Sequence, residues 1–200
     1  PVPAPARPQH YRVAVLGAAE AGKTALVARW AGKAPPPATY APTLGGPTET
    51  ALFLATAAGP ARVTLVDWCW DHAADADVTR QMAASDAAVA VFSLADGKSF
   101  TRAAVAAVAY GSTRPVVFVG THSDGKMRCD ADAVARRDAV LCSCATGAGV
   151  DRARATLLDA LGVKDSTSSS EDAWLLSERR VEAYERFLND DEACVLDLVK

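Results

Sequence analysis

The sequence predicts an α/β protein with a six-stranded, mostly parallel sheet that helices cover on both faces. Three observations lead to this prediction. Short apolar, β-branched runs alternate with longer helical stretches along most of the chain. The turn sequence AAGP joins two such runs, 47–56 and 61–67, and predicts a hairpin with one antiparallel strand. Hydrophobic residues make up 50% of the 200 residues, enough for a sizeable core.

The elements follow one another in a regular order. YRVAVL is the first predicted strand, and a glycine-containing loop and the helix KTALVARWAG come after it. Beyond the hairpin, AAVAVFS and PVVFVG are typical of buried central strands, and AVLCS is a further strand candidate. The predicted strands are 11–16, 47–56, 61–67, 87–93, 115–120 and 139–143, and the predicted helices are 23–32, 75–85, 98–109, 130–138 and 148–162.

The chain divides into three predicted parts. Residues 1–10, PVPAPARPQH, are Pro-rich and predict a flexible tail, and residues 11–163 form the domain. Residues 164–200 begin with the polar linker KDSTSSSED and continue as an amphipathic helix. Two interpretations of this helix stay open: it packs on the domain's own surface, or it binds a partner. Its apolar residues at helical spacing are Trp174, Val181, Tyr184 and Leu188.

Charge and cysteine usage exclude several classes. The net charge of −3 gives no electrostatic reason to expect nucleic acid or an anionic membrane as a partner. The five cysteines have no framework spacing and predict reduced thiols, and no second Cys/His pair completes a zinc site with Cys142 and Cys144. No apolar run is long enough to span a bilayer. We therefore expect a cytoplasmic protein.

The stretch GAAEAGKT predicts a phosphate-binding loop. It satisfies the pattern G-x-x-x-x-G-K-[ST], in which backbone N–H groups at a helix N-terminus point at phosphate oxygens. The lysine would reach the β- and γ-phosphates, and the threonine hydroxyl would ligate Mg²⁺. The alternative is a chance match in a chain rich in alanine, but a strand precedes the loop and a helix follows it. The residues expected at the phosphates are Glu20, Ala21, Gly22, Lys23, Thr24 and Ala25.

Further motifs follow in a fixed order. TYAPTLGG contains Tyr40 and Thr43, LVDWCWD places Asp67 at a strand end, VVFVGTHSD ends at Asp124, and CSCATGAGV follows the last strand. Together with the loop, these motifs resemble the Ras-like small GTPases, most closely their Rab-type and Rab-like members. The resemblance covers residues 11–162 and implies a P-loop NTPase fold.

The resemblance also assigns roles. GTP or GDP would bind with Mg²⁺, and the metal ligands would be Thr24, Thr43 and Asp67. Asp124 would accept two hydrogen bonds from guanine, with His122 beside the base. A backbone N–H among Ser143, Cys144 and Ala145 would meet the guanine O6.

Departures from the family pattern concern hydrolysis and the base. The glycine of the D-x-x-G element is replaced by Trp70, and Asp71 stands where the family has the glutamine that orients the attacking water. No confident catalytic residue therefore remains, and we expect slow hydrolysis, although Asp71 can equally point to solvent. His122 replaces the lysine of N-K-x-D, and its imidazole can still stack on the base; the alternative is an ordinary surface histidine.

Three details are similar to the Rab-like GTPase subunits of intraflagellar transport trains. They are the EAGKT ending of the loop, the PTLGG sequence and the aspartate at the glutamine position. Cys194, followed by VLDLVK, predicts no prenylation box. The resemblance thus implies a nucleotide-loaded module that binds protein partners through its switch regions and its C-terminal helix, in a ciliary or flagellar setting.

Two other functions stay open. A pseudo-GTPase would be a structural subunit with an empty or permanently filled pocket. A P-loop kinase for small molecules would need an arginine-rich lid, and the adjacent arginine pairs are Arg136-Arg137 and Arg179-Arg180.

Overall fold

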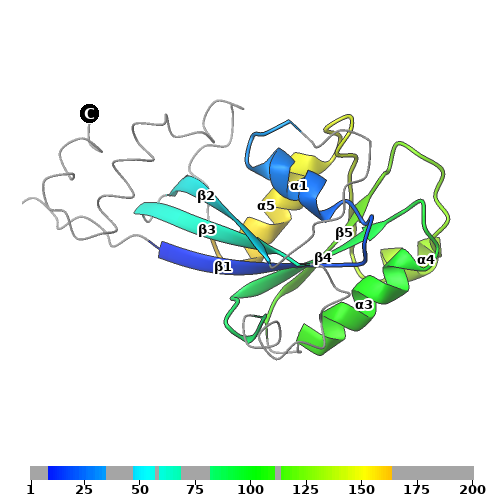
Figure 1. The fold of residues 1–200 in the computed structure, drawn as a ribbon, viewed down its shortest axis with the longest axis horizontal. Coiled ribbons are helices and arrows are strands. Elements are labelled where there is room, and N and C mark those ends of the chain that lie inside the picture. Colours follow the sequence, from blue (N-terminus) through cyan, green and yellow to red (C-terminus); the bar gives the residue numbers. More distant parts are fainter. Residues whose placement is uncertain (1–8, 35–46, 57–58, 69–81, 111–113, 164–200) are drawn as a thin grey trace, which may run out of the picture.

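The computed structural model describes residues 9–34, 47–56, 59–68, 82–110 and 114–163 (Figure 1). Strands and helices alternate along this part of the chain, as the sequence predicts. In chain order the elements are β1 (Gln9–Leu16), α1 (Lys23–Trp30), β2 (Thr48–Thr56), β3 (Gly59–Asp67), β4 (Ala87–Ser93), α3 (Ser99–Tyr110), β5 (Val116–Thr121), α4 (Ala131–Ala135), β6 (Val140–Leu141) and α5 (Val150–Ala160).

The sheet has six strands in the order β2-β3-β1-β4-β5-β6. The pairs β1–β3, β1–β4, β4–β5 and β5–β6 are parallel, and only β2 runs antiparallel, next to β3. The mostly parallel, six-stranded sheet with one antiparallel strand is therefore confirmed. Helices α1 and α5 lie on one face of the sheet, and α3 lies on the other (Figure 1).

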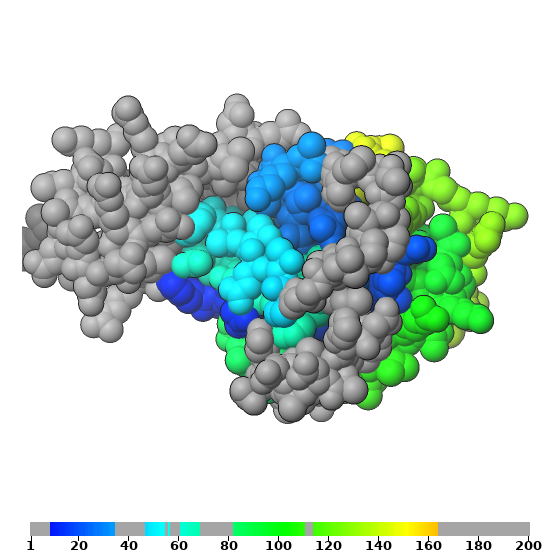
Figure 2. Space-filling model, in the orientation of Figure 1, coloured from blue at the N-terminus to red at the C-terminus, as the bar shows by residue number. Residues whose placement is uncertain are grey.

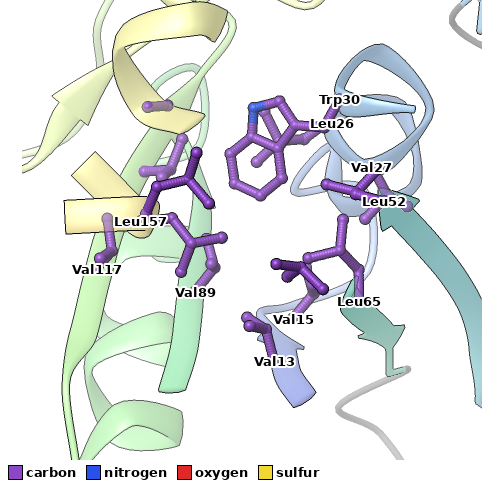
Figure 3. Packing of buried hydrophobic residues seen from close by; sticks show 14 of the residues in the cluster. Val13, Val15, Leu26, Val27, Trp30, Leu52, Leu65, Val89, Val117 and Leu157 are labelled. Carbon is purple, nitrogen blue, oxygen red and sulfur yellow. The ribbon is translucent and has the colours of Figure 1, made fainter. Parts of the chain in front are cut away.

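The central strands are buried on both faces. In β1, Val13 and Val15 pack into the cluster formed with α1 and α5, whereas Ala14 and Leu16 pack toward α3. This alternation follows from the period of two in a strand. Trp30 projects from α1 between the two helices and the sheet, toward Leu157 of α5 (Figure 3).

Several boundaries differ from the prediction. β1 begins at Gln9, so the last two residues of the predicted tail belong to a strand, where Gln9 pairs with Ala61 and His10 with Arg62. Both residues are exposed, so an apolar pattern cannot reveal them. α4 and β6 are shorter than predicted, five and two residues long. Most of the helix predicted over 75–85 and all of residues 164–200 lie outside the described residues.

On the surface of the molecule, α1 lies next to the β2–β3 hairpin (Figure 2). In Figure 2 the blue α1 and the cyan β2–β3 hairpin lie side by side on the face that is visible. Among the described residues, no helix has the length and apolar composition that crossing a membrane requires.

Candidate functional site

The predicted site residues gather at one edge of the sheet. The loops after β1, β3 and β5 leave from the carboxyl ends of parallel strands, which lie at the same edge. In open α/β sheets this edge is where ligands bind. We name the two parts of this candidate site after the ligand groups that the sequence predicts there. The phosphate end is formed by residues 17–24 with Asp67, and the base end by residues 121–124 with 143–145.

The loop before α1 has the backbone of an anion cradle. Gly17 has φ +148° and lies so close to β4 that a Cβ atom there would be 2.2 Å from Val91 O. Glu20 and Gly22 have left-handed φ values of 61° and 83°. α1 then begins without a side-chain cap. The dipole of the helix favours negative charge at this N-terminus.

Lys23 folds back over this loop. Its ammonium donates to Gly17 O at 3.0 Å and to Ala18 O at 2.8 Å, and the side chain is buried. The charge is therefore held beside the cradle. Glu20, in contrast, is exposed. Ala21 is buried and Ala25 is half-buried.

Thr24 and Asp67 meet at the end of β3. The Thr24 hydroxyl donates to Asp67 Oδ2 at 2.6 Å, and Asp67 is only 3% exposed. Burial raises the pKa of Asp67, although the Thr24 hydrogen bond and the Lys23 charge oppose this. Hydroxyl and carboxylate oxygens are the hard ligands that Mg²⁺ takes, so this pair fits a magnesium site completed by phosphate oxygens. No cluster of three or more His, Cys, Asp or Glu side chains suited to a metal occurs in the described part of the chain.

The base end consists of two loops held together. The Ser123 N–H donates to Cys142 O at 3.1 Å. Asp124 is exposed, and a hydrogen bond from Ser143 lowers the pKa of its carboxyl group. The carboxylate is thus ionised at neutral pH and can accept hydrogen bonds from two neighbouring N–H groups of a ligand.

Thr121 connects the two ends of the site. Its hydroxyl donates to Ala21 O at 2.7 Å and lies 3.1 Å from Phe92 O, so β5 is tied to the phosphate loop and to β4. His122 follows with a left-handed φ of 58°, and its Nδ1 lies 3.0 Å from both Ser93 Oγ and Thr121 Oγ1. The sequence placed Thr121 in a motif, but only the structure gives it this connecting role.

Arg29 was not among the predicted site residues. It projects from α1 and donates to two carbonyls of the base end, Cys144 O and Ala145 O. No motif marks it, because its contacts join segments more than a hundred residues apart. Cys142 and Cys144 are buried free thiols. The hydrogen bond from Cys142, helped by the charge of Arg29, lowers the pKa of the Cys144 thiol, and the same bond raises that of Cys142.

Four predicted residues fall outside the described residues. They are Tyr40 and Thr43, together with Trp70 and Asp71, which depart from the small-GTPase pattern. Of the three predicted magnesium ligands, Thr24 and Asp67 lie in the described residues, and Thr43 stays a prediction.

No protein-family model matches this sequence, and no curated protein matches it significantly.

Proposed function

We propose that this chain is a small GTPase-like protein with a P-loop NTPase fold, which binds GTP or GDP with Mg²⁺. One observation carries the proposal: a glycine cradle with a buried lysine and an ionised Asp124 lie at one sheet edge, joined by Thr121. A phosphate site alone would fit many nucleotides. The carboxylate at the far end adds a preference for the base.

The phosphate end supports binding of a di- or triphosphate. The loop lies at a helix N-terminus, whose dipole favours anions, and the Lys23 ammonium is held against it by the carbonyls of Gly17 and Ala18. Thr24 and Asp67 supply oxygens for Mg²⁺, which when bound neutralises charge between phosphates. Thr43, in the TYAPTLGG sequence, would complete the metal site.

The base end supports guanine. Guanine presents two donors, N1–H and the 2-amino group, on one edge, and a carboxylate can accept both. Adenine presents an acceptor at N1. Asp124 is exposed, so its carboxylate is an ionised acceptor at neutral pH, and the hydrogen bond from Ser143 lowers its pKa further. His122, with its ring nitrogen beside two hydroxyl groups, would flank the base.

Hydrolysis is proposed to be slow. Trp70 and Asp71 replace the glycine hinge and the water-orienting glutamine, and losing that contact removes transition-state stabilisation while leaving affinity intact. The protein would then act as a nucleotide-loaded module that recognises protein partners through its switch regions and C-terminal helix. The EAGKT and PTLGG sequences favour a trafficking or ciliary transport assembly.

The experiment is a calorimetric titration of nucleotide-stripped protein with GTP and with ATP, both with Mg²⁺. We expect GTP to bind far more tightly than ATP. Lys23→Ala should abolish binding, whereas Lys33→Ala, an exposed lysine just beyond α1, should leave it unchanged. Equal or tighter binding of ATP would support the P-loop kinase instead, and no binding of either would support an empty pseudo-GTPase.

A further inference from the structure

Arg29 joins the helix of the phosphate loop to the base end of the site. Its Nε–H donates to Cys144 O at 2.7 Å, and an Nη2–H donates to Ala145 O at 2.8 Å. A guanidinium presents parallel donors in a rigid fork, which suits two neighbouring acceptors better than a lysine ammonium does. One half-buried side chain therefore fixes two consecutive carbonyl groups.

Fixing these carbonyl groups also fixes the direction of the N–H groups in the same two peptide groups, those of Ala145 and Thr146. A peptide group is planar, and its C=O and N–H point in opposite directions. The Ala145 N–H, which shares a peptide group with Cys144 O, thus points away from Arg29 and α1. The preceding peptide is fixed in the same way, because the Gly147 N–H donates to Ser143 O at 2.9 Å.

Arg29 adds little to the core itself. The packing of α1 against α5 already has the buried Trp30, whose indole N–H donates to Val150 O at 3.1 Å. The two Arg29 hydrogen bonds go only to the turn at residues 144–145. Their main consequence is therefore the orientation of that turn next to Ser143 and Asp124.

We infer that Arg29 is a positioning residue for the base, which turns the N–H group of Ala145 toward position 6 of a purine. This inference rests on the proposed function. An N–H group there favours a purine with an oxygen acceptor at C6, as in guanine or hypoxanthine. An amino group at C6, as in adenine, would bring two donors together.

The test compares Arg29→Met, which keeps length and apolar packing but has no donor, with the wild type. We expect the Kd for GDP to rise about tenfold or more, the loss of hydrogen bonds from a charged group. The Kd for ADP, measured by competition against fluorescent GDP, should change little. The Kd of Arg29→Lys for GDP should lie between those of the wild type and Arg29→Met, because a single ammonium replaces the two parallel donors of the guanidinium. Arg102→Met, an exposed arginine on α3, is the matched control and should behave as the wild type.

A second measurement does not depend on the nucleotide. In nucleotide-free protein, amide hydrogen exchange of residues 142–149 should be about tenfold faster in Arg29→Met, with β4 unchanged. Equal loss of GDP and ADP affinity, full rescue by lysine, or unchanged exchange would overturn the inference. Failure of the wild type to bind GDP would instead refute the proposed function, and the exchange result would still decide whether Arg29 fixes the turn.

Discussion

The hydroxyl of Thr24 and the carboxylate of Asp67 are joined by a hydrogen bond of 2.6 Å, although 43 residues separate them. Thr24 lies in the first turn of α1, and Asp67 is the last residue of β3. The two residues meet at the carboxyl end of β1, because α1 follows β1 and β3 is paired with β1 in parallel. Burying an acid here is unfavourable for the fold. Under the proposed function, a bound Mg²⁺ would compensate for this cost.

Asp67→Asn should stabilise the metal-free, nucleotide-free protein at neutral pH. Burial raises the pKa of Asp67 in the folded state above about 3.9, its value in the unfolded chain. The folded state therefore favours the protonated form. That contribution to stability is complete below the unfolded pKa and is lost as the pH rises through the folded pKa. Asparagine removes this loss.

Urea unfolding at several pH values, in the presence of a chelator, measures the effect. The gap between Asp67→Asn and the wild type should widen as the pH rises from about 4. With Mg²⁺ and GDP the order should reverse, because only the wild type keeps the carboxylate ligand. Asp159→Asn, at an exposed position on α5, should show neither effect. A wild type that stays the more stable without metal would contradict the role of burial.

The fold could be predicted because each element has a local signal. β4, AAVAVFS, is buried at every position and is a continuous apolar run in the sequence. β6 and α4 have only short stretches of apolar residues, and their length depends on pairing with β5 and on the Asp130 cap. Such contacts are not local, so the sequence overestimated both elements.

The site could be predicted only where a motif carries it. Lys23 and Thr24 were predicted from the phosphate-loop pattern, and Asp67 and Asp124 from the resemblance to the small GTPases. The structure brings Thr24 into contact with Asp67, and the binding roles of the four residues stay predictions. Arg29 acts through carbonyl groups of a segment 115 and 116 residues away, and any residue with the right donors could do so. Its role follows from the packing of α1 against α5, which no local pattern encodes.

Gly17→Ala should destabilise the protein more than another glycine substitution at positive φ. The new Cβ would lie 2.2 Å from Val91 O in the central strand β4, so backbone must move, and we expect a loss of about 2 kcal/mol or more. Gly162→Ala is the control, because φ there is +70° but no atom lies within 4 Å. It should cost about 1 kcal/mol from backbone strain alone. If thermal or urea unfolding gave equal losses of stability for the two variants, β4 would be able to move away from the new Cβ atom without a free-energy cost.

Trp30→Ala should lower the free energy of unfolding by about 3–5 kcal/mol, the usual cost of a cavity left by a large aromatic residue. The side chain is 2% exposed and fills the space between α1, α5 and the sheet (Figure 3). Trp30→Phe keeps a ring but loses the hydrogen bond to Val150 O, so it should cost less. Val108→Ala, at a position 74% exposed, should change stability by less than about 0.5 kcal/mol. A small effect of Trp30→Ala in urea unfolding would show that α1 and α5 can close the gap.

The last prediction concerns turnover under the proposed function, and it follows from Trp70 and Asp71, which differ from the small-GTPase pattern. With Trp70 and Asp71 in place of glycine and glutamine, hydrolysis of bound GTP should be no faster than about 10⁻⁴ per second, the scale of unassisted Ras-type proteins. Asp71→Gln alone should help little, because tryptophan still lacks the conformational freedom of glycine at position 70. Trp70→Gly with Asp71→Gln should be faster than either protein. Single-turnover hydrolysis measures all three, and Asp71→Ala tests whether this carboxylate is a general base. A wild-type rate well above that scale, abolished by Asp71→Ala, would contradict this prediction and show that Asp71 is catalytic.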